Sequence, residues 1–207
     1  MPDILDQFLE NIKNASWLEY IAVVAGILSV WFSKKENILV YPVGLINTII
    51  YVYLSFDSEL IGEASVNFYY TVVSIYGWYI WAKKDTKSQP VLHITFSNRE
   101  QLRNQFLFFG FLYIIIFAAL TWLKHAFYPG VIPWADAFAS ASAFTGMWLM
   151  ARKKVESWYW WIVTNIASVP LFFVKGLVLT SVYYFILLIL AVFGLMEWRR
   201  KAKSFQG

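Results

Sequence analysis

Three side chains in one short stretch have the types and the spacing needed to bind a flat ring. Trp158, Trp161 and Asn165 follow the pattern W-x2-W-x3-N. On an α-helix these offsets place all three side chains on one face. Two indoles and a nearby amide suit a planar heteroaromatic ligand, and a cationic ring would gain cation–π attraction as well. The alternative is an aromatic belt at a membrane interface, because Trp158 begins its stretch.

Other polar side chains within apolar stretches could complete such a site. Asn47 either bonds the ligand or ties two helices together, and Tyr51 follows it by one turn. Asn67 and Tyr70 share a helical face, and Tyr184 is the counterpart of Asn67 in the internal repeat described below. Each of these is a candidate for contact with a ligand, and the alternative for each is an interhelical hydrogen bond.

The groups needed for catalysis or metal binding do not come together in the sequence. The chain has no cysteine and two histidines, His93 and His125, which lie in separate segments. The acidic residues of the apolar stretches lie near their ends, so there is no central proton relay, nucleophile–base pair or pair of catalytic carboxylates. We therefore expect a protein that is not an enzyme and that carries neither a metal nor a cofactor.

The composition requires lipid as part of the solvent. Of the 207 residues, 59% are hydrophobic and 14% charged, against about 45–50% and about 25% in soluble domains. This excludes disorder and nucleic-acid binding, and it predicts an all-α integral membrane protein. Seven stretches are long enough to cross a bilayer. They lie at about 17–33, 38–56, 62–82, 105–123, 132–151, 158–174 and 177–198.

The positions of lysine and arginine predict the orientation. With the N-terminus outside, 14 basic residues lie on the cytoplasmic side and 3 on the outer side, so the positive-inside rule places the C-terminus in the cytoplasm. Residues 1–16 begin with acidic rather than basic residues, which argues against a signal peptide. Their apolar residues recur at three- and four-residue spacing, which indicates an extracytoplasmic amphipathic leader, with a loosely ordered leader as the alternative. The polar interval 83–104 is the predicted linker.

The two ends of the chain resemble one another when residues 17–84 are laid over 134–201 with a shift of 117. Trp31, Gly77 and Trp81 then fall on Trp148, Gly194 and Trp198, and a shift of 118 places Asn47 on Asn165. Because three helices are an odd number, one linker helix between the halves gives both the same orientation. A 3+1+3 parallel repeat follows, with substrate between the halves. The predicted parts are leader 1–16, first repeat 17–84, linker and fourth helix 85–131, second repeat 132–201 and cytoplasmic tail 202–207.

Three segments resemble the PnuC family of bacterial vitamin transporters. They are residues 41–47 (YPVGLIN), residues 75–81 (IYGWYIW) and residues 156–165 (ESWYWWIVTN). The resemblance spans residues 17–201, and W-x2-W-x3-N is its most specific motif. It implies a SWEET-like 3+1+3 arrangement and a multi-pass protein of the bacterial inner membrane. Family members have been seen as trimers, so the resemblance also implies a homotrimer in the lipid bilayer.

The resemblance further implies uptake of nicotinamide riboside by facilitated diffusion and alternating access, with trapping by cytoplasmic phosphorylation. Asn165 stands where some relatives carry Asp, which favours the nicotinamide riboside branch, whereas Asn67 stands where many carry Gln. Thiamine transport on the same scaffold is the first alternative, and a seven-helix receptor or sensor is the second. The expected binding residues are Trp158, Trp161, Asn165, Asn47, Tyr51, Asn67, Tyr70 and Tyr184.

Overall fold

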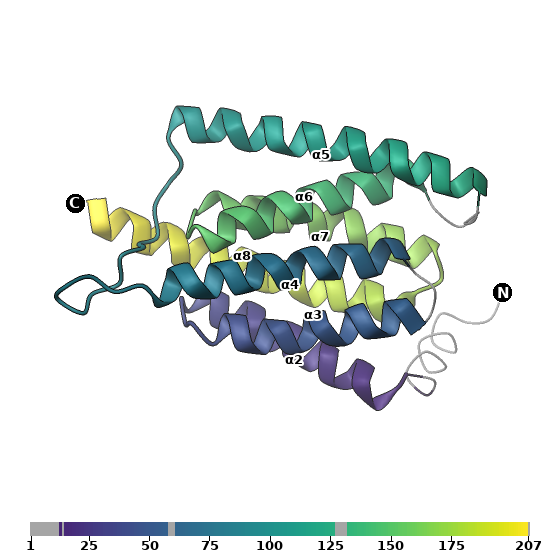
Figure 1. The fold of residues 1–207 in the computed structure, drawn as a ribbon, viewed down its shortest axis with the longest axis horizontal. Coiled ribbons are helices and arrows are strands. Elements are labelled where there is room, and N and C mark those ends of the chain that lie inside the picture. The colour runs from purple at the N-terminus through teal and green to yellow at the C-terminus, as the bar shows by residue number, and fades with distance from the viewer. Residues whose placement is uncertain (1–12, 14, 58–60, 127–131, 207) are drawn as a thin grey trace.

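The computed structural model describes residue 13 and residues 15–57, 61–126 and 132–206, which form a bundle of seven helices (Figure 1). The predicted leader lies almost wholly outside these residues. The helices are α2 (Trp17–Lys34), α3 (Val40–Asp57), α4 (Ile61–Ala82), α5 (Arg99–Ala126), α6 (Pro133–Ala151), α7 (Glu156–Val174) and α8 (Val178–Gln206).

Each predicted span coincides with one helix, and the two clear differences lie at polar ends. α5 begins at Arg99 instead of 105, because the Asn98 and Gln101 side chains each accept a hydrogen bond from the other's backbone N–H. α8 continues to Gln206, so most of the predicted tail is helical. Ala202 is buried in the core and keeps this last part of α8 against the bundle. The spans were predicted from hydrocarbon thickness, whereas both helices extend beyond their apolar segments.

Four helices, α2, α3, α5 and α8, are by length and composition apolar enough to cross a membrane on their own among the described residues. α6 and α7 reach the same length, but they bury polar side chains in contacts with other helices. Ser142, Thr145, Asn165 and Ser168 are all buried. A helix at the centre of a bundle does not face lipid on all sides, so its mean hydropathy can be lower.

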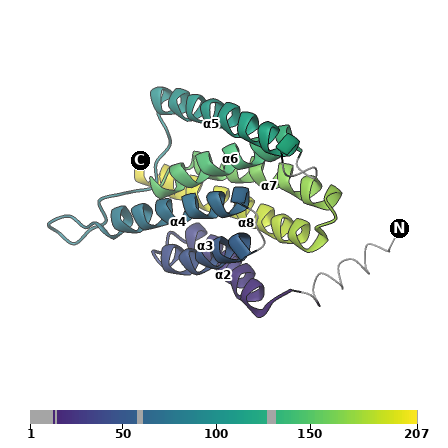
Figure 2. The ribbon, with the colours of Figure 1, turned by 45° about the vertical axis from the view of Figure 1, so that its right-hand side comes forward.

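The helices form two groups of three with α5 at the edge (Figures 1 and 2). Within each group, consecutive helices pack together: α2 on α3 and α3 on α4, then α6 on α7 and α7 on α8. The two groups meet where α2 packs on α8 and α4 packs on α6. α5 packs along α6, and the Trp160 Nε1–H of α7 donates a hydrogen bond of 2.9 Å to Gln105 Oε1 of α5.

The same packing contact occurs once in each group, and equivalent residues of its two copies are 117 positions apart in the sequence. In each, an aromatic ring from the middle helix lies over a glycine of the last helix and meets the next tryptophan edge to face. The ring centroids are 5.1 Å apart in the first group and 5.5 Å in the second. The residues are Tyr41 over Gly77 with Trp81, and Trp158 over Gly194 with Trp198.

The close approach of Trp158 to α8 leads to a prediction on stability. A Cβ at Gly194 would lie 2.5 Å from the Trp158 ring, which is fully buried and cannot move aside. We expect Gly194→Ala to cost about 1–3 kcal/mol through overpacking, seen as a lower melting temperature in detergent. Gly110→Ala is the matched control, because nothing lies within 4 Å of a Cβ there. An equal melting temperature for both variants would contradict this packing.

The interhelical segments 35–39, 83–98 and 152–155 all lie at one end of the bundle, which we call the linker end. The linker docks here: the Thr95 N–H donates to the Lys153 carbonyl and the Val155 N–H to the Thr95 carbonyl. The Ser97 N–H and hydroxyl donate to the Glu156 carboxylate. Burial lowers the pKa of Lys154 below its usual value, while the nearby Glu156 opposes this shift.

The two groups are tied together at the linker end by charge. Lys153 Nζ lies 2.8 Å from Glu36 Oε1, and Lys201 Nζ lies 3.2 Å from Glu36 Oε2. Lys153 is 4% exposed, and its ammonium group lies 4.6 Å from the centre of the Trp81 ring. Glu36 and Lys153 are 117 residues apart, and both have positive φ, at 60° and 52°. We call Glu36, Lys153 and Lys201 the linker-end ion cluster.

Candidate functional site

Aromatic side chains from both groups meet inside the bundle. Tyr70 of α4 lies 6.0 Å from Phe144 of α6 and 6.2 Å from Trp161 of α7, measured between ring centroids. The side chains of Tyr183 and Tyr184 of α8, whose rings are 5.6 Å apart, also lie near Tyr70. We call these five residues the central aromatic cluster. Four helices contribute to it, so its shape depends on how the two groups are placed.

Asn165 is a buried polar side chain on the same helix as Trp161 of the cluster. It is one helical turn from Trp161, and the four-residue offset places both on the same face of α7. The residue is 2% exposed, and its Oδ1 accepts no hydrogen bond from the described residues. An unpaired buried carbonyl oxygen costs free energy. Asn165 therefore offers an unused hydrogen-bond acceptor beside an aromatic surface.

Asn47 connects three helices. Its Nδ2 donates a 2.7 Å hydrogen bond to the Ala22 carbonyl of α2, and its side chain also shares a hydrogen bond with Tyr183 of α8. Gly26 makes room for this junction, because a Cβ there would overlap the Tyr183 hydroxyl and lie 2.8 Å from Asn47 Nδ2. The helix-tying alternative for Asn47 is thus present in the structure, next to the central aromatic cluster.

The remaining predicted residues surround the same region to different degrees. Tyr51 interacts with Tyr183. Tyr184 stacks on Phe172, with 5.1 Å between ring centroids and 7° between ring planes. The Asn67 carbonyl accepts a 2.9 Å hydrogen bond from the Thr71 hydroxyl within α4. Tyr51 therefore adjoins the cluster at Tyr183 and Phe172 adjoins it at Tyr184, whereas Asn67 lies on α4 about one turn before Tyr70.

Trp158 occupies a different place from the other predicted residues. Its ring is 1% exposed and forms part of the hydrophobic core at the linker end, between Gly194 and Trp198. Its Nε1–H has no hydrogen-bond acceptor among the described residues. The aromatic-belt alternative for this residue requires exposure to the interface, and the ring is buried.

Phe144 and Tyr183 are members of the cluster that were not among the predicted residues. Phe144 lies in an alanine-rich helix, and nothing in its sequence neighbourhood separates it from a packing residue. Tyr69 holds this position by donating a 3.1 Å hydrogen bond from its hydroxyl to the Phe144 carbonyl. Tyr183 directly precedes Tyr184, and such neighbours point about 100° apart on a helix. The pair could therefore have been read as lining two adjoining surfaces.

The chemistry available in the cluster is binding. Its members supply ring faces and hydroxyl groups, and Asn165 beside it supplies a carbonyl oxygen. Together these groups favour a flat ligand that is neutral or cationic. No group of three His, Asp or Glu side chains in the described parts of the chain could hold a metal ion. Two surface hollows, of about 450 Å³ and about 220 Å³, are lined by residues at the linker end and not by the cluster.

Comparison with known proteins gives consistent results. The family model described as nicotinamide mononucleotide transporter matches residues 16–200. The nicotinamide riboside transporter PnuC of Escherichia coli (strain K12) is 26% identical over 211 residues, covering 92% of this chain and 88% of that protein. The PnuC of Neisseria mucosa is 28% identical, with 93% and 75% covered. The riboflavin/roseoflavin transporter RibM of Streptomyces davaonensis is 23% identical, with 90% and 86% covered.

A solved structure is similar across nearly the whole chain. The crystal structure of the vitamin B3 transporter PnuC superposes with a TM-score of 0.68 at 26% identity, covering 97% of this chain and 88% of that one. The family match reaches all seven helices and includes all five members of the central aromatic cluster, and the structural match covers nearly the whole chain. The chain belongs to the nicotinamide mononucleotide transporter family and is a multi-pass membrane transporter.

Proposed function

We propose that this transporter takes up nicotinamide riboside and binds it at the central aromatic cluster. The observation that carries the proposal is the buried, unpaired Asn165 Oδ1 one turn from Trp161. Nicotinamide riboside has a flat cationic pyridinium ring with a carboxamide on its edge. The ring would gain cation–π attraction from the aromatic side chains, and the carboxamide N–H would satisfy the Asn165 oxygen. The names of the relatives from Escherichia coli and Neisseria mucosa support the same substrate.

The predicted residues take unequal parts in this proposal. Trp161 and Tyr70 contact the ring, and Asn165 bonds the carboxamide. Asn47 and Tyr51 act through their interactions with Tyr183, Tyr184 is one of the rings of the cluster, and Asn67 lies one turn from Tyr70 on α4. Trp158 does not contact the substrate, because its ring is buried in the linker-end core. It acts indirectly, by packing the start of α7 against Gly194 of α8.

The two groups of three helices are proposed to be parallel repeats that move about this site in alternating access. The contact of Tyr41 with Gly77, matched 117 residues later by Trp158 with Gly194, supports the repeat. The Glu36–Lys153 pair supports it as well, because it joins equivalent positions of the two halves. α5, which packs along α6 at the edge, is then the single helix between the repeats.

The linker end is proposed to face the cytoplasm of a bacterial inner membrane, supported by the 14 to 3 division of basic residues. None of the five described members of the central aromatic cluster carries a charge, so we propose facilitated diffusion, with cytoplasmic phosphorylation trapping the transported compound. Assembly as a homotrimer, which the family resemblance implies, stays a prediction.

Counterflow in proteoliposomes tests the function. Vesicles containing the purified protein and unlabelled nicotinamide riboside should accumulate the labelled compound, whereas protein-free vesicles should not. Excess thiamine or riboflavin should leave the initial rate unchanged, because neither presents the same carboxamide to Asn165. If labelled thiamine accumulates in the same assay and labelled nicotinamide riboside does not, the scaffold carries thiamine. If saturable binding occurs without counterflow, the receptor alternative holds.

A further inference from the structure

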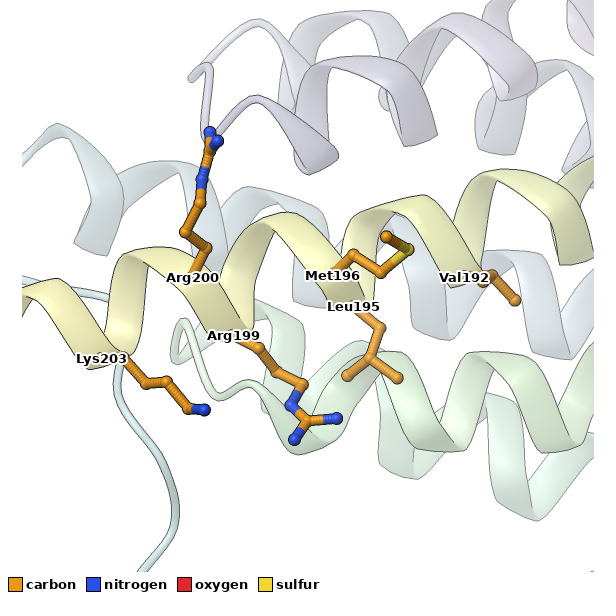
Figure 3. A pocket seen from close by; sticks show the side chains of 6 residues that line it. All are labelled: Val192, Leu195, Met196, Arg199, Arg200 and Lys203. Carbon is orange, nitrogen blue, oxygen red and sulfur yellow. The ribbon is translucent and has the colours of Figure 1, made fainter.

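One face of α8 is apolar up to Met196 and cationic from Arg199 onward. Two neighbouring rows of side chains run along the helix with four-residue spacing, Leu195–Arg199–Lys203 and Val192–Met196–Arg200. All six residues belong to α8 alone, and they line a shallow hollow of about 450 Å³ that is open to the outside of the bundle. Figure 3 shows Leu195, Arg199 and Lys203 extending to one side of α8 and Arg200 to the other. We call these six residues the α8 groove.

The α8 groove has the polarity of an anionic phospholipid. Four residues of helix rise about 6 Å, so each row passes from the apolar zone to the cationic zone within one turn. Val192 and Met196 are exposed, and apolar side chains there would contact acyl chains. Arg199 and Lys203 have no ion pair with the described residues, whereas Arg200 is paired with Glu197 at 2.8 Å. Arg199 and Lys203 are thus available to bind a phosphate at the C-terminal end of the apolar part of the groove.

We propose that the α8 groove binds one anionic phospholipid, with its phosphate between Arg199 and Lys203 and one acyl chain along Leu195 and Met196. Charge complementarity selects an anionic headgroup, and the apolar half of each row selects a lipid over a free phosphate. The groove opens to the outside of the bundle, with Leu195 at its inner edge packed against the linker-end core, and it shares no residue with the central aromatic cluster. The proposal therefore does not depend on which substrate the transporter carries.

Native mass spectrometry of the delipidated protein in detergent, titrated with phosphatidylglycerol, tests the lipid site. We expect one tightly held adduct per chain, and much weaker binding of phosphatidylcholine with the same acyl chains. Glycerol phosphate, which lacks the chains, should also bind more weakly. In Arg199→Gln/Lys203→Gln the phosphatidylglycerol affinity should fall by about 30-fold, since each basic residue contributes about fivefold.

The matched control is Lys84→Gln/Lys87→Gln, which removes two exposed cations from the linker at the same end of the molecule. It should retain the parent affinity within about twofold. Unchanged counterflow and melting temperature will show that the groove variant is folded. Equal loss in both double variants would overturn the proposal and leave only general attraction to the basic end. It would also be overturned by equal binding of phosphatidylcholine, or by a groove occupied by a second copy of the chain.

Discussion

Replacing Asn165 with leucine will weaken nicotinamide riboside binding by about 5- to 150-fold. The proposed bond joins the substrate carboxamide to a carbonyl oxygen that has no partner among the described residues. Leucine has nearly the same size but cannot accept a hydrogen bond, so the carboxamide would be desolvated without compensation, at about 1–3 kcal/mol. Isothermal titration with the purified variant measures this directly.

For the same variant we expect weaker substrate binding but no loss of stability, and this combination separates a binding role of Asn165 from a structural one. An asparagine that holds helices together loses stability on substitution. An asparagine kept for a ligand leaves an unpaired buried group, and leucine removes that cost. We therefore expect the melting temperature of Asn165→Leu without substrate to equal or exceed that of the parent. A large decrease, with substrate affinity intact, would assign Asn165 to packing.

Trp161→Ala should also weaken nicotinamide riboside binding, because the Trp161 ring packs beside Tyr70 within the cluster. The loss of a desolvated cation–π contact of about 2 kcal/mol corresponds to about 30-fold in affinity. Trp134→Ala is the matched control, since Trp134 lies exposed at the beginning of α6. Parent affinity in both Trp161→Ala and Asn165→Leu would show that the site is elsewhere.

The elements of this fold were predictable because a membrane-spanning helix must satisfy its own backbone and match the thickness of the hydrocarbon. All seven spans could therefore be placed from apolar length alone. The beginning of α5 could not, because it depends on Asn98 and Gln101, two polar residues in a segment that reads as linker. The helical end of α8 depends on Ala202 packing in the core, which is a tertiary contact.

The candidate site was harder to predict than the helices, and the W-x2-W-x3-N pattern shows why. Helical periodicity places Trp158, Trp161 and Asn165 on one face, but a face about 10 Å long meets different neighbours along its length. Trp158 meets Gly194 and Trp198 in the core, whereas Trp161 meets Tyr70. Periodicity gives the direction of a side chain, and only the packing of the other helices decides what it touches.

Neutralising Glu36 will open the linker end of the transporter. Glu36 pairs with Lys153 and Lys201 across the two groups of helices, and these ion pairs exist only while the groups are together at this end. Under the proposed alternating access, loss of 1–3 kcal/mol from the closed state would raise the open population by about 5- to 150-fold. Glu36→Gln should also lower stability, by about 3–5 kcal/mol, because the buried Lys153 loses its partner.

A single cysteine can report this opening cleanly, because the chain contains none of its own. Ser74 is a suitable position. It is 3% exposed and shares a face of α4 with Tyr70 on one side and Gly77 and Trp81 on the other, at offsets of four, three and seven residues. The introduced thiol would lie between the substrate site and the linker-end ion cluster. In Ser74→Cys alone, an impermeant maleimide added from the linker side should react slowly.

The labelling rate of Ser74→Cys should rise by at least about fivefold when Glu36→Gln is added. To separate opening from loss of stability, Glu36→Gln can be combined with Lys153→Met. This removes the buried charge together with its partner, so it should restore most of the melting temperature. It should keep the fast labelling, because the tie between the groups is still absent. Lys35→Gln, at the neighbouring residue and outside the ion pairs, should label like the parent. Fast labelling that disappears when stability is restored would mean that the Glu36–Lys153 pair supports the fold and has no part in gating.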